Sequence, residues 1–403
     1  MRALLPLALA LLLYSTSSAG CPPQTPLARV DGHTITLSYY SFVKSRVPEP
    51  VFQHLYGNSD RELLNKVVER TLILADAERR GLFNSPELKK RVERFKIKRL
   101  GYAYLNSRVA EPTVSEEELR SALSKVPEKE RTPERIKSLK AALKTQKFLS
   151  ERERVLTSVE KKLKILNAYP TSPSTAVAEF EGRKITLKEL QPLISGKPTP
   201  EKLKKAALDY SLYLLALKEG LDKTPEFQNL LRSFKERLAV QSFERELYSQ
   251  VKVSDEEVKS YYESHREEFK LPGKARVEVW KFRSLPEAKR AMELLKEGKT
   301  EELPKPRRWA LSSDDTNNPL AQLVFSSNKE LNLLELPSGE VLLVKTLSKT
   351  PPRPMPYGDA YPEVKGKLRS QKFKKLLEEK LSQLRKELGV ELYAENLKCL
   401  GKE

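Results

Sequence analysis

The sequence predicts a mainly α-helical protein of two tandem modules, the second of which carries a small inserted α+β domain. Three observations lead to this prediction. One set of motifs occurs twice in the same order, apolar residues recur at helical spacing along most of the chain, and one stretch in the second half alternates between strand-like and helix-like patterns. The composition, 39% hydrophobic and 32% charged, is typical of a helix-rich chain with modest cores.

The duplication is visible in three motifs that keep their order. They are Gly-x-x-Ile-Thr-Leu at 32–37 and 182–187, Gly-Leu at 81–82 and 220–221, and Val-Ser followed by three acidic residues at 114–118 and 253–257. The last two pairs share one offset of 139 residues (220 − 81 and 254 − 115). Chance matches do not keep register over this distance, so the chain contains a duplicated module.

Start and stop signals predict the helices of each copy. In the first copy, Gly81 ends a helix, Ser85 and Pro86 begin the next one, and Ser115 with Glu118 forms a capping box. The second copy repeats the plan, with helices expected at 201–219, 225–248 and 254–268. Both copies end with a Gln-Lys-Phe motif that opens a charged helix, followed by a short strand. We expect each copy to form its own helical core, with an exchange of the tail helices as the alternative.

The second copy differs from the first by an extra segment from Leu271 to about Ser348. Its pattern predicts a strand at 276–282, a helix at 287–296, an irregular stretch and a strand at 340–346. The predicted organisation is a signal peptide (1–20), a tether (21–27), a first module (28–170), a linker (171–176), a second module (177–270 and 349–403) and the insert (271–348).

The N-terminus has the features of a signal peptide. Arg2 precedes an apolar run at 3–13, which is too short to span a bilayer, and small residues follow up to Cys21. The residues from Ser18 to Cys21, at the end of this segment, resemble a bacterial lipobox, with Ser18 where that motif prefers Leu. We therefore expect an extracytoplasmic, bacterial protein that a lipid on Cys21 anchors to the membrane. The alternatives are a free Cys21 after ordinary cleavage, or a disulfide to Cys399, which competes for the same sulfur.

The bulk numbers exclude several classes of function. The net charge of +19 would suggest a nucleic-acid partner in a cytosolic protein, but secretion excludes it here. Three His and two Cys are too few for a structural zinc site, so we expect no metal. The sequence has no phosphate loop, dinucleotide fingerprint or nucleophile elbow, and no cofactor is expected.

The order of the motifs resembles that of the SurA and PrsA chaperone-foldases and their membrane-anchored relatives. The matching features are the two Gly-x-x-Ile-Thr-Leu openings, the Gly-Leu breaks with their Pro-Glu helix starts, and the 253–257 motif followed by Tyr261 and Tyr262. This resemblance implies SurA-N-like helical modules around an inserted parvulin domain, which is a peptidyl-prolyl isomerase in that family. It also implies that the partners are unfolded or nascent envelope or secreted polypeptides. The oligomeric state stays open.

The insert departs from the family at the isomerase site. The two family His positions fall on Val279 and Val341, and the Met and Phe of the prolyl pocket fall on Asn317 and Leu320. Valines cannot supply the polar pair that the twisted X-Pro amide needs. We therefore expect a degenerate parvulin-like domain without catalytic residues, in a chaperone that holds unfolded proteins. An active isomerase with a rearranged pocket, and a scaffold for one folded partner, are the alternatives.

Aromatic residues are the candidates for peptide binding, because a chaperone needs exposed apolar surface for unfolded chains. They are Tyr210, Tyr213, Phe227, Phe234, Phe243, Tyr261, Tyr262, Trp280 and Trp309. Many of them lie at helical spacing, which core packing explains equally well. Both interpretations stay open at the level of the sequence.

Overall fold

The computed structural model describes residues 20–400 as two compact units. The predicted signal peptide, apart from Gly20, lies outside the described residues. Unit 1 comprises the chain up to residue 247 and from residue 377 onward, and unit 2 comprises residues 248–376. No helix within the described range is both long enough and apolar enough to cross a membrane.

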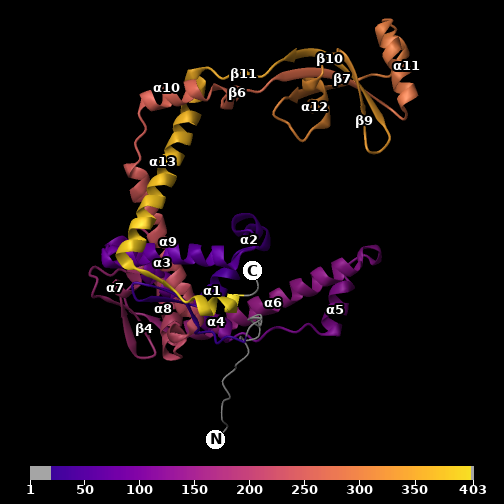
Figure 1. Cartoon of the computed structure of the whole chain (residues 1–403). Helices are drawn as coiled ribbons and strands as arrows, with labels where there is room; N and C mark the ends of the chain where they lie inside the picture. Colours follow the sequence, from indigo (N-terminus) through magenta and orange to yellow (C-terminus); the bar gives the residue numbers. More distant parts are fainter. Residues whose placement is uncertain (1–19, 401–403) are drawn as a thin grey trace. The chain divides into compact units, whose positions relative to one another are not determined.

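Unit 1 is mainly helical, as predicted, with two small three-stranded sheets (Figure 1). The elements of its first copy are β1 (Pro26–Val30), β2 (His33–Thr36), α1 (Leu37–Lys44), α2 (Glu49–Tyr56), α3 (Asp60–Arg79), α4 (Pro86–Ser107), α5 (Glu116–Leu123), α6 (Pro133–Glu160) and β3 (Leu163–Ile165). Those of its second copy are β4 (Ala176–Phe180), β5 (Arg183–Thr186), α7 (Leu187–Leu190), α8 (Pro200–Lys218), α9 (Pro225–Gln250), the end of α13 (Tyr357–Leu388), β12 (Val390–Leu392) and a last 3-10 helix (Ala394–Leu400).

Local sequence signals set the ends of these elements. The turns of both opening hairpins have positive φ at two successive residues, Asp31-Gly32 and Glu181-Gly182, which is the geometry that matches the twist of a two-residue hairpin. Gly81 takes a φ of 67° after α3, a conformation that glycine adopts without steric cost. The Ser85 hydroxyl accepts the Leu88 N–H at the start of α4, and Ser115 with Glu118 forms the predicted capping box of α5.

The strands exchange partners between the two copies. Strand β3, which ends the first copy, pairs with β4 in the opening hairpin of the second copy. Strand β12, which ends the second copy, pairs with β1 in the hairpin of the first. The expectation that each copy has its own core is therefore wrong, and the alternative of exchange holds. The linker of about ten residues between β3 and β4 explains this, because strands joined by a short connection usually pair.

The helices follow the same exchange. Helix α4 of the first copy packs on α8 of the second, and Val159 of α6 is buried in the same cluster as Leu203 of α8. In the other core, side chains of α9 bond to residues of β2, α1 and α3, and Arg385 of α13 lies 3.8 Å from Glu69 of α3. We call the core around the first hairpin, α3 and α9 core A, and the core around the second hairpin, α8, α4 and α6 core B.

Phe95 of α4 and Phe234 of α9 show that the exchange is nearly symmetric. Their rings stack with centroids 3.9 Å apart and an angle of 6° between the planes. The two residues are equivalent positions of the two copies, because they differ by the repeat offset (234 − 95 = 139). A residue that contacts its own equivalent lies on a twofold axis, so unit 1 is arranged like an isologous dimer within one chain.

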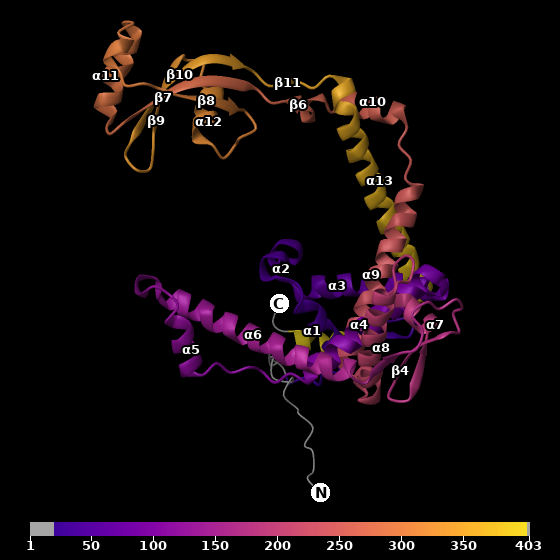
Figure 2. The ribbon, with the colours of Figure 1, turned by 180° about the vertical axis from the view of Figure 1, so that it is seen from behind.

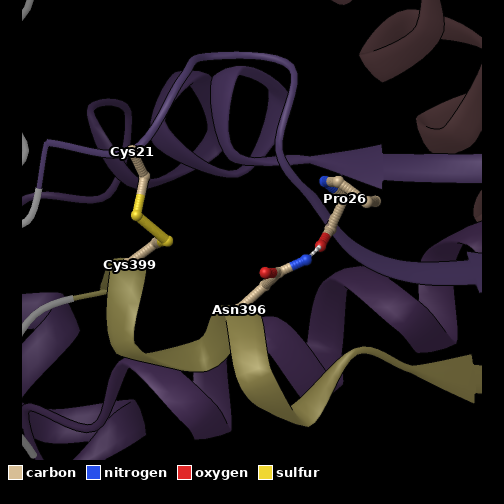
Figure 3. Close-up of a disulfide and its surroundings, with 4 residues drawn as sticks. All are labelled: Cys21, Pro26, Asn396 and Cys399. Carbon is tan, nitrogen blue, oxygen red and sulfur yellow. Dashed lines mark hydrogen bonds between the residues drawn. A yellow bond between two sulfur atoms is a disulfide. The ribbon is translucent and has the colours of Figure 1, made fainter.

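A disulfide joins the two ends of the described chain. Cys21 is bonded to Cys399, with their Cα atoms 5.9 Å apart (Figure 3). Next to the bond, the side-chain amide of Asn396 donates to the carbonyl oxygen of Pro26 at 2.8 Å. One Sγ atom cannot carry both a disulfide and a lipid, so in this structure Cys21 is not the lipidated residue that we expected. The disulfide alternative is the arrangement observed.

Unit 2 is a small α+β domain on a helical base (Figure 2). Its elements are α10 (Asp255–Ser264), β6 (Lys270–Leu271), β7 (Lys274–Phe282), α11 (Leu285–Lys296), β8 (Arg307–Ser312), α12 (Pro319–Ser326), β9 (Leu331–Glu335), β10 (Val341–Thr350), β11 (Arg353–Pro354) and the start of α13. The four long strands form an antiparallel sheet in the order β8-β7-β10-β9, and β6 pairs with β11 where the chain enters and leaves this domain. Strands β8 and β9 and helix α12 fall in the stretch predicted as irregular.

Candidate functional site

Two regions carry the residues predicted to matter: the sheet of unit 2 and a groove in core B. The sheet has two covered faces. Helix α12 covers one face, where Val277 and Val279 of β7 pack with Val324. Helix α11 covers the other face, where Trp280 packs with Leu343 of β10.

The structure does not bring Val279 and Val341 together. Val341 is paired with Phe282 across the β7–β10 ladder, and Val279 is paired with Val344. Successive side chains of a strand point to opposite faces, so Val279 and Val341 lie on opposite sides of the sheet. The β10 residue on the Val279 side is Val344, which is fully buried. Matching a strand to a family motif does not show which face of the sheet a side chain occupies, because that depends on the register between β7 and β10.

The face that carries Val279 is apolar. Val277, Val279, Val344 and Leu320 belong to one cluster and are at most 7% exposed, whereas Asn317 lies exposed in the loop before α12. The histidine nearest in sequence, His265, stacks on Tyr261 at the end of α10, outside the sheet. This face therefore presents no pair of polar side chains to a bound X-Pro amide at the positions that we predicted.

The two tryptophans have different surroundings. Trp280 is 5% exposed, and its Nε1 donates to the carbonyl oxygen of Pro304 at 2.8 Å, so it is a core residue. Trp309 is 44% exposed on the edge strand β8. Its neighbour Arg308 is paired with Glu278 at 3.0 Å. Of the two, only Trp309 offers an aromatic surface to solvent.

Most of the other predicted aromatic residues pack inside the protein. Phe227, Phe243 and Tyr262 are buried, Phe234 stacks on Phe95, and Tyr261 packs against Phe269. Tyr213 of α8 is half-buried and Tyr210 is 8% exposed, and both line a groove on the surface of core B. The groove has a volume of about 860 Å³ and lies between α4, α7 with the turn after it, and α8.

Hydrogen bonds fix one wall of this groove. The hydroxyl of Tyr210 donates to Glu189 at 3.0 Å, and Arg183 pairs with the same carboxylate at 2.8 Å. Burial, together with the charge of Glu189, raises the pKa of Tyr210 above its ordinary value, so this tyrosine stays protonated. Burial opposes ionisation of Glu189, but the hydrogen bonds from Thr186 and Tyr210 outweigh it and lower the pKa of this carboxyl. The wall is therefore rigid and internally neutralised.

The rim of the groove is basic. Lys89 of α4 and Lys188 of α7 are exposed, and within residues 20–400 their ammonium groups have no hydrogen bond or ion pair. Lys90 donates to the carbonyl oxygen of Ile194 at 3.1 Å, and Glu93 is paired with Lys96 at 3.1 Å. Sequence reasoning found the two tyrosines but not the groove, because its walls come from both copies and meet only through the exchange.

The comparisons with known proteins agree with the resemblance in the sequence. Residues 253–362 match the family model of the PPIC-type PPIase domain. The SurA/PrsA-type resemblance is confirmed by this match, which spans the segment where a parvulin-like domain was predicted. No curated protein matches the chain.

Solved structures of the same group also match. Two come from work on PEB4 and Cj1289, described as SurA-like chaperones of Campylobacter jejuni. One is 18% identical, covers 54% of this chain and 99% of its own, with a TM-score of 0.34; the other is 12% identical, covers 91% and 98%, with a TM-score of 0.29. A third is the peptidylprolyl isomerase PrsA of Bacillus cereus, which is 14% identical, covers 57% and 100%, and has a TM-score of 0.21.

Proposed function

We propose that this protein is an extracytoplasmic chaperone that holds unfolded envelope or secreted polypeptides, and that its PPIC-type domain binds without isomerising. The observation that carries the proposal is the apolar face of the sheet in unit 2. Val277, Val279 and Val344 fill the space where an isomerase needs polar side chains around the peptide bond.

Rotation about an amide bond has a barrier of about 18–20 kcal/mol, because the bond has partial double-bond character. An isomerase must stabilise the twisted amide more strongly than either planar form. A surface of aliphatic side chains binds planar and twisted forms alike, because it makes no directional contact with the amide nitrogen or oxygen. The valines here are also buried under α12, so this face gives no acceleration, and binding of clients by this domain falls to exposed side chains such as Trp309.

Two features support the extracytoplasmic location. The sequence begins with a signal-peptide pattern, and the two cysteines of the chain are joined in a disulfide. Disulfides persist in oxidising compartments such as the bacterial periplasm and are reduced in the cytosol. Holding of unfolded chains is consistent with the apolar and aromatic surfaces at Trp309 and at the groove of core B.

Isomerase activity is the second candidate function, because the family of the matched domain is named for this activity.

Two assays on the same preparation separate the candidates. The first measures light scattering of an unfolded outer-membrane protein after dilution from denaturant, with and without the chain. The second measures refolding of a protein whose folding is limited by a prolyl bond, with an active parvulin as the positive control.

We expect suppressed aggregation in the first assay and a refolding rate equal to that in buffer in the second. Refolding that accelerates in proportion to the concentration of the chain would establish the isomerase instead. Aggregation that proceeds unchanged at a severalfold molar excess of the chain would contradict the chaperone proposal.

A further inference from the structure

The two cores of unit 1 are built from equivalent elements of the two copies, and one difference between them explains the groove. Helix positions in the two copies correspond at an offset of 139 residues, and hairpin positions correspond at an offset of 150 (182 − 32). In core A, a network of polar side chains fills the position between α1, α3 and α9 that is equivalent to the groove. A smaller pocket of core A, of about 350 Å³, lies elsewhere and is lined by Val43, Leu63 and Val240. In core B, the equivalent space between α7, α8 and α4 is the groove.

Arg232 and Glu236 of α9 close core A. Glu236 is 1% exposed and accepts hydrogen bonds from Tyr39 at 2.6 Å and from Thr71 at 3.3 Å. The guanidinium of Arg232 pairs with Glu236 at 3.2 Å and donates to the carbonyl oxygen of Thr34 at 2.6 Å. It also lies 4.1 Å above the ring of Tyr39. These contacts leave no room for a ligand at this position of core A.

The equivalent residues of core B cannot form this network. Arg232 corresponds to Glu93 and Glu236 corresponds to Ile97, so the charge that closes core A is reversed at one position and absent at the other. Ile97 contributes an apolar side chain to the groove instead.

A second closing contact is also replaced. In core A, the amide of Asn229 on α9 donates to the hydroxyl of Ser38 on α1 at 3.3 Å. The equivalent residues in core B are Lys90 and Lys188. Two cations cannot bond to each other, so the Asn229–Ser38 bond has no counterpart here, and Lys90 instead donates to the carbonyl oxygen of Ile194 beyond α7. The groove in core B is thus open because the residues that close the same position in core A are replaced there by Glu93, Ile97, Lys90 and Lys188.

The charges around the groove are unbalanced. The Glu93 carboxylate is neutralised by Lys96. The Glu189 carboxylate is neutralised by Arg183 and accepts a hydrogen bond from the Tyr210 hydroxyl. The ammonium groups of Lys89 and Lys188 have no partner among the described residues. Two unpaired ammonium groups beside an apolar floor attract an anionic ligand that also carries an apolar group.

We propose that this groove binds an extended polypeptide segment in which a carboxylate side chain lies next to an aromatic or large aliphatic one. Lys89 and Lys188 pair with the carboxylate, and Tyr213 and Pro192 contact the apolar side chain over a floor that includes the buried Ile97. The inference rests on the proposed chaperone function only in that unfolded clients supply such segments. A groove of about 860 Å³ is large enough for two or three side chains of a peptide.

Binding is weak and sensitive to salt, because the segment loses conformational freedom when it docks and the lysines are exposed. These properties suit a site that must release its client. They also predict that acidic residues in a client matter at this groove.

Core A supplies substitutions that test the proposal without endangering the fold. In the variant Lys89→Gln/Lys188→Ser, each lysine is replaced by the residue found at the equivalent position of core A, namely Gln228 and Ser38. Tyr213→Leu likewise copies Leu74. The matched control is Lys137→Gln/Lys140→Ser on α6, which removes two exposed lysines whose ammonium groups have no partner among residues 20–400.

The readout is fluorescence anisotropy with the full chain and three labelled 12-residue peptides. One peptide carries alternating Asp and Phe, one carries Asn in place of Asp, and one carries Lys. We expect the acidic peptide to bind at least tenfold more tightly than the other two. Lys89→Gln/Lys188→Ser and Tyr213→Leu should each weaken this binding at least fivefold, while the control changes it less than twofold.

Equal losses in the lysine variant and in the control would show that only net charge matters, and they would overturn the proposal. Equal affinity for the Asp and Asn peptides would also overturn it. Sedimentation of the chain with vesicles that contain phosphatidylglycerol, lost in the lysine variant while no peptide binds, would identify a membrane surface as the ligand instead. If aggregation suppression persists while the groove binds no acidic peptide, the inference fails and the chaperone function stands.

Discussion

The hydrogen bond between Tyr39 and Glu236 offers a direct test of the exchange between the two copies. Tyr39 belongs to the first copy and Glu236 to the second, and their oxygens are 2.6 Å apart in a buried site. Tyr39→Phe removes a hydrogen bond to a carboxylate, which stabilises a fold by about 1.5–3 kcal/mol. Glu236→Ala leaves Arg232 without its partner in the core, and we expect a loss of about 3–5 kcal/mol.

The double mutant is the decisive variant. Once Glu236 is absent, Tyr39→Phe has no bond left to remove, so the two losses do not add. We expect a coupling energy of about 1.5–3 kcal/mol, equal to the loss that Tyr39→Phe causes alone. Tyr40→Phe with Glu236→Ala is the control cycle, because the Tyr40 hydroxyl bonds Asp60, and these two losses should add within about 0.5 kcal/mol.

Urea unfolding followed by far-UV circular dichroism measures these energies in the helical unit 1. Trp280 and Trp309, the two tryptophans of the chain, both lie in unit 2, so tryptophan fluorescence reports separately whether unit 2 is affected. A coupling energy below about 0.5 kcal/mol between Tyr39 and Glu236 would refute the exchanged packing, because residues of two independent modules do not couple.

Three further outcomes follow from the structure. Hydrogen bonds from His33 and Lys235 lower the pKa of Glu78 to about 2, below its ordinary 4.5. Glu78→Gln should therefore cost about 1–2 kcal/mol at pH 7, after allowance for solvent screening, and the cost should disappear as the pH falls from about 4.5 to 2 in acid titrations of unfolding. Cys399→Ser should destabilise unit 1 by about 2–4 kcal/mol in urea, and intact mass should show the wild-type chain two hydrogens lighter than its reduced form and without an acyl group. Deleting 272–352 and joining the paired strands β6 and β11 through two glycines should leave the urea midpoint of the helical signal within about 0.5 M; loss of cooperative unfolding would show that unit 1 needs the domain.

The sequence predicts the features of this fold that depend on neighbouring residues. The caps at Ser85 and Ser115 and the stop at Gly81 are local, so their residue types suffice to place the helix ends. The exchange of β3 and β12 is not local. Because both hairpins have the same pattern, each tail strand fits either one, and the short link between β3 and β4 decides the pairing.

The candidate sites could be predicted only in part for the same reason. Tyr210 and Tyr213 follow from composition, but the groove needs α4 of the other copy as its second wall. Val279 and Val341 follow from the resemblance to the family motifs, which places residues along the sequence, whereas the face of each side chain is defined only when the β7–β10 register is known. The short elements β8, α12 and β9 were missed because none is long enough to show a clear period.

The differences between the two cores indicate that the two copies have different roles: core A stabilises unit 1, and core B has a surface for binding. Core A is closed by the buried Arg232–Glu236 network and by the disulfide that holds β12 beside β1. Core B has no counterpart of the Arg232–Glu236 pair and has a groove with two lysine ammonium groups that are unpaired among the described residues. Because exchanged elements join the cores through the Phe95–Phe234 stack, the stability of core A supports core B, and substitutions that open a site in core B are tolerated. Copying core A residues into core B should therefore raise stability and weaken binding together, whereas the reverse copies in core A should lower stability, and urea unfolding measures both changes.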